Sequence, residues 1–91
     1  MNVTRAEVLA AYEALIEGSR SRDQVACWAS QLRAASDTEN LEYEPKADES
    51  AIWDALEFLA GVDLKDSPDS YLHDERDMEN SLISFRKTLS R

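Results

Sequence analysis

The chain has few of the residues that support covalently or metal-stabilised folds. Its 91 residues include one cysteine, one histidine, two glycines and two prolines. The single cysteine, Cys27, allows no internal disulfide, which fits a reducing compartment. No apolar run approaches the length of a membrane span, and the N-terminus lacks the charged head and apolar core of a signal peptide. We therefore expect a cytoplasmic protein without a membrane segment.

Basic residues are scarce in the middle of the chain. Residues 37–79 hold 15 of the 19 acidic side chains and three basic ones, a local charge of 3 − 15 = −12, whereas the whole chain carries −9. Residues 1–36 are neutral, and residues 80–91 carry three positive charges and no acid. A block of like charge on one surface accelerates encounters with a partner of opposite charge. We therefore expect a basic protein partner and, for lack of a basic face, no direct contact with nucleic acid.

Part of this acidity has a simpler explanation. Carboxylates in the first turn of a helix complement the helix dipole, and five acids fall in such predicted positions: Asp48, Glu49, Asp74, Glu75 and Asp77. Acidity that serves solubility alone is also common in small helical proteins. Both explanations stay open beside a functional one.

Two helices are predicted in the first part of the chain. Thr4 with Glu7, and Ser21 with Gln24, have the spacing of a capping box, so one helix should begin after Thr4 and the next after Ser21. Apolar residues recur at helical spacing behind each cap, and Gly18 should end the first helix. The short linker favours an antiparallel helical hairpin.

Two further helices are predicted in the acidic part. One should cover residues 48–60 and end at Gly61 in a left-handed conformation. Because its helical wheel is apolar on two sides, we expect it to be the central helix, with Trp53 in the core. The last helix should begin near Asp74. The predicted fold class is all-α: one domain over residues 1–91, a small antiparallel four-helix bundle with two acidic connecting loops.

The two connections have different patterns. In the segment 41–45, Leu and Tyr alternate with Glu before Pro, which predicts an extended loop with its acids on one side. In the second connection, Ser67 followed by Pro68 predicts a short helical turn that tucks Tyr71 and Leu72 inward.

No residue pattern indicates catalysis or ligand binding. His73 has no nucleophile, orienting partner or glycine-rich phosphate loop near it in the sequence. Cys27 has no partner for metal or nucleophilic chemistry. The aspartates after residue 61 fail the ligand spacing of an EF-hand. We therefore expect no enzyme, no cofactor and no metal site.

Two short motifs resemble a known class of proteins. Leu41-Glu-Tyr-Glu-Pro and Asp66-Ser-Pro-Asp-Ser-Tyr are similar to the Leu-x-Tyr-Tyr-Pro and Asp-Ser-Pro segments of small acidic helical immunity proteins, which protect bacteria from their own nuclease bacteriocins. Residues 52–73 also resemble small proteins of toxin–immunity loci. The resemblance implies that Tyr43 contacts a toxin beside its flanking carboxylates, with Glu44 in place of the second tyrosine of that class.

The sequence thus predicts an immunity protein or antitoxin, a toxin inhibitor that binds the basic nuclease domain of a bacteriocin or contact-dependent growth inhibition system. Its carboxylates would replace nucleic-acid phosphates on the toxin, or block a neighbouring surface that the substrate must cross. The alternative is a small acidic regulatory or adaptor subunit that docks through apolar helix faces around Phe58. The predicted partner-binding residues are Glu42, Tyr43, Glu44, Asp54, Glu57, Asp63, Asp66, Asp69, Tyr71 and Asp74.

Overall fold

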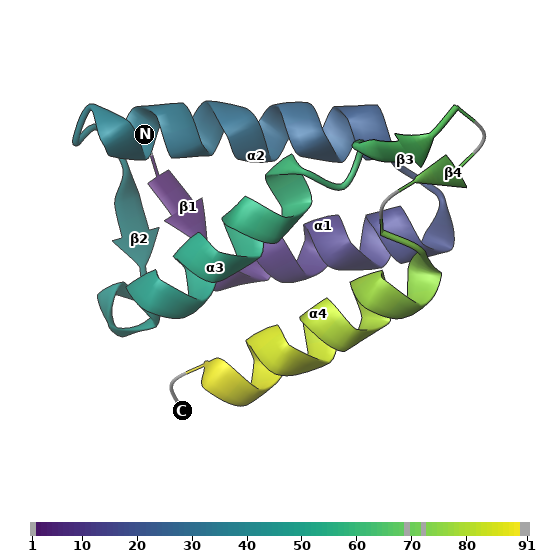
Figure 1. Ribbon diagram of the computed structural model, residues 1–91. Coiled ribbons are helices and arrows are strands. Elements are labelled where there is room, and N and C mark those ends of the chain that lie inside the picture. Colours follow the sequence, from purple (N-terminus) through teal and green to yellow (C-terminus); the bar gives the residue numbers. More distant parts are fainter. Residues whose placement is uncertain (1, 69, 72, 90–91) are drawn as a thin grey trace.

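The computed structural model describes residues 2–68, 70–71 and 73–89, of which residues 66 and 67 are described by their backbone only. Four α-helices and four short strands make up this part of the chain (Figure 1). In chain order the elements are β1 (Asn2–Thr4), α1 (Arg5–Glu17), α2 (Arg22–Asp37), β2 (Glu42–Glu44), the 3-10 helix η1 (Lys46–Asp48), α3 (Glu49–Ala60), β3 (Lys65–Ser67), β4 (Ser70–Tyr71) and α4 (Glu75–Thr88).

The helices begin where their caps predict. The Glu7 amide donates to Thr4 Oγ1 at 3.1 Å and the Gln24 amide donates to Ser21 Oγ at 3.1 Å, and in both boxes the reciprocal bond is present. These caps satisfy amides that a helix start otherwise leaves without a partner. Gly18 follows α1 with φ of 83°, the left-handed conformation that favours glycine. The predicted starts of α1 and α2 are confirmed.

The end of α3 differs from the prediction. Gly61 has φ of −104°, so the expected left-handed conformation is wrong. Its amide donates to the Phe58 carbonyl at 3.1 Å, and the Val62 amide donates to the Leu59 carbonyl at 3.3 Å. Because these tighter bonds already satisfy the last carbonyls, the chain leaves α3 through a continued turn without a left-handed residue.

α3 is the central helix, as its two apolar sides predict. It contacts α1, α2 and α4, and Figure 1 shows it crossing obliquely between α2 and α4. Ile52, Leu56 and Leu59 are completely buried on it. The fold is therefore mostly helical with four helices, but the oblique crossing of α3 departs from a regular antiparallel bundle. No helix in the described ranges combines the length and apolar character that crossing a membrane requires.

Both connections contain strands, which the all-α prediction lacked. β1 and β2 pair in parallel, with Val3 opposite Tyr43. β3 and β4 pair in an antiparallel hairpin, with Lys65 opposite Tyr71. The period-two alternation of segment 41–44 is that of a strand, and β1, anchored in the core by the buried Val3, supplies the partner that its backbone needs.

The predicted helical turn at Ser67–Pro68 is wrong, since Ser67 ends β3 and Pro68 lies in the turn of the hairpin. Tyr71 is 41% exposed rather than tucked inward. Leu72, which was expected beside it, lies outside the described residues. A two-stranded hairpin directs alternate side chains to opposite faces, which leaves Tyr71 on the outside.

Trp53 lies at the edge of the core instead of inside it. Its neighbours Ile52 and Leu56 take the buried side of α3, while the Trp53 ring is half-buried. The guanidinium carbon of Arg33 lies 5.7 Å from the centre of the ring. Trp53 therefore acts as a partial cover with a cationic neighbour, a common arrangement for tryptophan at a protein surface.

This difference predicts unequal effects of two substitutions on α3. Leu56→Ala should lower the free energy of unfolding by about 2–5 kcal/mol, because it leaves a cavity in a closed interior. Trp53→Ala should cost less, since water already reaches the ring. Urea unfolding followed by circular dichroism measures both. A larger loss for Trp53→Ala than for Leu56→Ala would place the tryptophan in the core after all.

The buried Tyr12 predicts a pH dependence of stability. Burial raises the pKa of Tyr12 above its ordinary value of 10.0, and its 2.7 Å hydrogen bond with Ser81 lowers it in part. Above pH 10, Tyr12 ionises first in the unfolded chain, so its contribution to stability is complete below that pH and is lost as the pH rises toward the folded-state value. Tyr12→Phe should remove this part of the alkaline loss. Urea unfolding at about pH 8 and about pH 11 tests it, and an identical alkaline loss in both proteins would contradict it.

Candidate functional site

The predicted partner-binding residues do not gather in one place. Glu42, Tyr43 and Glu44 form β2, at the end of the molecule opposite the β3–β4 hairpin (Figure 1). Glu42 and Glu44 are exposed there, whereas Tyr43 is half-buried and packs against the core. The Tyr43 hydroxyl lies 2.9 Å from Ser36 Oγ in a hydrogen bond. Tyr43 therefore secures β2 to the end of α2.

The other predicted residues lie on α3 and along the connection after it. Asp54 and Glu57 are exposed on α3, and Asp63 is half-buried in the turn that follows. In the hairpin, only the backbone of Asp66 is described, and Asp69 lies outside the described residues. Asp74 caps α4, where its carboxylate accepts a hydrogen bond from the Asp77 amide at 2.9 Å. The predicted partner-binding carboxylates whose side chains are described thus lie in three separate places: on β2, on α3, and between α3 and the start of α4.

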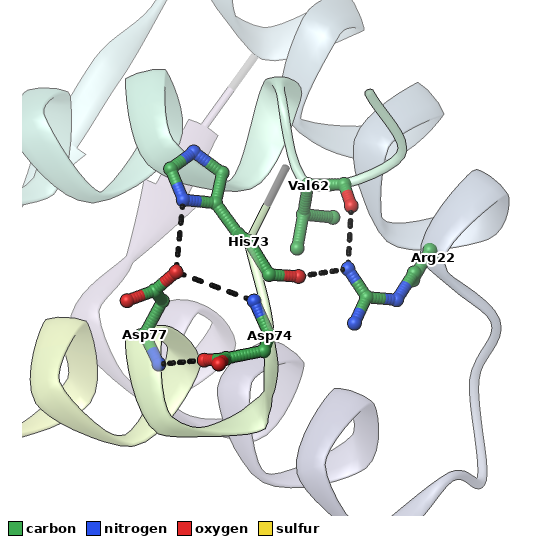
Figure 2. Close-up of polar contacts among 5 residues, drawn as sticks. All are labelled: Arg22, Val62, His73, Asp74 and Asp77. Atoms are coloured by element: carbon green, nitrogen blue, oxygen red, sulfur yellow. Dashed lines mark hydrogen bonds and ion pairs between the residues drawn. The ribbon is translucent and has the colours of Figure 1, made fainter. Parts of the chain in front are cut away.

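The hairpin end meets the start of α2 through Arg22. Nη1 of Arg22 donates to the Val62 carbonyl at 2.9 Å and to the His73 carbonyl at 2.7 Å (Figure 2). Residues 62 and 73 stand on either side of the hairpin in the sequence. One guanidinium on α2 therefore closes the base of the loop that carries β3 and β4.

Tyr71 lies against the same guanidinium. The guanidinium carbon of Arg22 is 4.0 Å from the centre of the Tyr71 ring, and Lys65 Nζ is 5.5 Å from it. Cations over an aromatic face are attracted by the negative potential of the ring. The ring is 41% exposed, and Leu64, before β3, is 55% exposed. The hairpin thus presents an aromatic ring and an aliphatic side chain to the outside.

His73 has structural contacts at the base of the hairpin. Its ring lies 4.7 Å from the ring of Phe58, between centroids, and its Nδ1 lies 3.5 Å from Asp77 Oδ2 (Figure 2). The Asp74 amide donates to the same oxygen of Asp77 at 3.3 Å. Within the described ranges no group of three potential metal ligands gathers at this or any other place. The contact of His73 with Asp77 therefore supports the start of α4.

The outer face of α2 is a second exposed surface near this end. A shallow hollow in it is lined by Arg20, Asp23, Gln24, Cys27, Trp28 and Gln31. The guanidinium carbon of Arg20 lies 5.8 Å from the centre of the Trp28 ring, which is half-buried. Cys27 is exposed, and Gln31 Nε2 lies 3.8 Å from its sulfur. The hollow therefore combines one cation, one aromatic ring and side-chain amides with a single acid.

The segment that carries this hollow is more basic than its neighbours, although the hollow itself has no net charge, because both Arg20 and Asp23 line it. Residues 18–36 contain three arginines and one aspartate, a local charge of 3 − 1 = +2. Counting over residues 1–36 hides this excess, because α1 carries three glutamates and one arginine, a charge of 1 − 3 = −2 that cancels it. The excess also depends on Arg20 in the turn before α2, since α2 alone carries two arginines and two aspartates, a charge of 2 − 2 = 0.

The position of Arg22 predicts a large effect on stability. Arg22→Ala should lower the free energy of unfolding by about 2–4 kcal/mol, because hydrogen bonds from a charged donor contribute more than neutral ones and two buried carbonyls lose their partner. Arg22→Lys should recover part of this loss, since one ammonium retains the charge without the planar fork. Urea unfolding of the three proteins measures this. Unchanged stability in Arg22→Ala would contradict the role of Arg22 at the hairpin base.

Comparisons with known proteins match most of the chain. A family model described as "YxzC DNA-binding protein" matches residues 2–85. The "Uncharacterized protein YxzC" of Bacillus subtilis (strain 168) is 31% identical over 73 residues, which cover 80% of this chain and 54% of that protein. The chain thus spans about half the length of this curated relative. No solved structure matches the chain significantly.

These matches overturn the functional predictions made from the sequence. The resemblance to immunity proteins is wrong, because the model that matches most of the chain describes a different family. The expected toxin partner, the adaptor alternative and the exclusion of nucleic acid are wrong for the same reason. The motifs behind the resemblance cover about a dozen residues of two connections, which fold here as short strands. Since the family model spans residues 2–85, the chain belongs to the YxzC DNA-binding protein family.

Proposed function

We propose that the chain binds DNA through the first half of α2 and the turn before it, together with the neighbouring hairpin. This DNA-contact surface is defined by Arg20, Gln24, Trp28, Gln31, Lys65 and Tyr71. The observation that carries the proposal is the local excess of positive charge in residues 18–36, where Arg20 lies on this surface, Arg22 supports Tyr71 and Arg33 lies over Trp53. Its support from the family lies in the description of the matching model as a DNA-binding protein.

The other basic segment is a weaker candidate. Arg86 and Lys87 lie near the end of α4, beyond residue 85, where the match to the family model ends. Arg86 Nη2 also lies 3.3 Å from Glu13 Oε1 in an ion pair with α1. A carboxylate beside the cation opposes the approach of a phosphate. The DNA-contact surface on α2 therefore fits the family description better.

The side chains of this surface suit different parts of DNA. Arg20 can contact a phosphate as a charged donor. The Gln31 amide offers a donor and an acceptor, the pair that matches the N6 and N7 edge of adenine. Gln24 has less freedom, because its Oε1 already accepts the Ser21 amide at 2.9 Å. Direct reading of bases on α2 thus depends mainly on Gln31.

The net charge limits how the chain can bind. Each phosphate neutralised by a cation releases counterions, which makes affinity depend on salt. With the half-buried Arg20 and the exposed Lys65 as the cations of the surface, we expect about two phosphate contacts and a slope of log affinity against log salt of about −2. Binding should therefore be weak unless contacts other than phosphate contacts contribute.

We also propose that this binding takes place in the cytoplasm and involves no catalysis. Bacterial DNA is reached in that compartment, and the proposed contacts require only donors, acceptors and aromatic rings. The proposal concerns this chain, which spans about half the length of its curated relative.

Fluorescence anisotropy with labelled DNA at low and raised salt tests the proposed function. Arg20→Ala should weaken binding and make the salt slope shallower by about 1, the effect of losing one phosphate contact. Arg86→Ala is the matched control, because it removes the same charge outside the proposed surface and should leave binding unchanged. Failure of the folded chain to bind any DNA at low salt, or a larger loss for Arg86→Ala than for Arg20→Ala, would overturn the proposal.

A further inference from the structure

We infer that the preferred ligand of the DNA-contact surface is single-stranded DNA, with Trp28 and Tyr71 as stacking platforms for unpaired bases. This inference rests on the proposed function, because it specifies the form of DNA that the same surface takes. The rings of Trp28 and Tyr71 carry the inference, and the charge of the surface does not.

Each of the two rings lies beside the guanidinium of an arginine. Arg20 lies 5.8 Å from the Trp28 ring and Arg22 lies 4.0 Å from the Tyr71 ring. Because the two arginines are separated by a single residue, both arginine–aromatic pairs lie at the same end of α2. Trp28 opens into the hollow on α2, and Tyr71 is exposed on the hairpin. One end of the molecule therefore offers two aromatic surfaces, each beside a guanidinium.

The second pair is held in place before any ligand arrives. Arg22 is fixed by its hydrogen bonds to the Val62 and His73 carbonyls, and Tyr71 rests on that fixed guanidinium. A ring that is already positioned loses little conformational freedom when a base stacks on it. Arginine planes also stack with bases, so the pair can extend the platform beyond the ring.

The charge of the chain favours a single strand over a duplex. Duplex DNA carries about one negative charge per 1.7 Å of axis, whereas each strand alone carries about one per 3.4 Å. A chain of net charge −9 is repelled less by the sparser array. Stacking on an aromatic ring needs no charge on the protein and tolerates any base, because every base has an aromatic face. Unpaired bases thus supply the binding energy that phosphate contacts do not.

The test compares two forms of one sequence. Anisotropy is measured with a labelled oligonucleotide of about 12 nucleotides, as a single strand and as a duplex. The wild-type chain should bind the single strand more tightly. Tyr71→Ala should weaken single-strand binding roughly 5- to 150-fold, the range for loss of one stacked base, whereas Tyr71→Phe should retain most of the affinity. Leu64→Ala is the control on the same hairpin and should have little effect.

Trp28 is tested by its fluorescence, because it also packs against the core and its removal can disturb folding. In a Trp53→Phe background Trp28 is the remaining tryptophan, and a stacked base should quench its emission as the single strand is added. Unquenched Trp28 together with full affinity in Tyr71→Ala would overturn the inference, as would equal or tighter binding of the duplex. If the chain binds the duplex but shows one of these results, only the inference of a single-stranded ligand is overturned. If it binds neither form of DNA, the proposed function itself is overturned.

Discussion

The contact of the Arg22 guanidinium with two backbone carbonyls determines the shape of the hairpin end. The carbonyls of Val62 and His73 come from the end of α3 and the approach to α4, and one nitrogen of Arg22 joins both to the start of α2. Through that junction the guanidinium fixes where the loop leaves and returns, and it supports the Tyr71 ring. Stability and the proposed binding surface therefore depend on the same side chain. Its position in the first turn of α2 in turn depends on the Ser21 cap.

An acidic protein can bind DNA only if its charges are separated in space. Here most acids follow residue 36, among them those of β2, α3 and the start of α4, and three more lie on α1, whereas the positive excess of residues 18–36 lies on α2 and the turn before it. The separation is incomplete, because Asp23 lines the hollow on α2 and Asp66 follows Lys65 in the sequence. Such a surface favours contacts that do not depend on charge, which is why the aromatic rings matter more here than the number of cations.

Local signals in the sequence predicted the helices well. The caps at Thr4, Ser21 and Asp74 and the two-sided apolar pattern of α3 depend on neighbours within a few residues, so they are readable without the fold. The strands were not readable, because each is two or three residues long and is defined by a partner elsewhere in the chain. The exposure of Tyr71 and the partial exposure of Trp53 follow from that packing. The positive excess of residues 18–36 was missed because charges were summed over residues 1–36, and the family was missed because two short motifs carried the resemblance.

The hydrogen bond between Tyr12 and Ser81 also has a consequence for the order in which the chain acquires its structure. These residues are 69 positions apart, and the Tyr12 ring lies 6.0 Å from that of Phe85 on α4. During synthesis α1 emerges first and can pair with α2 and α3, but the part of Tyr12 that meets Ser81 and Phe85 is covered when α4 follows. This part of α1 thus stays exposed until α4 has left the ribosome. α4 then covers it.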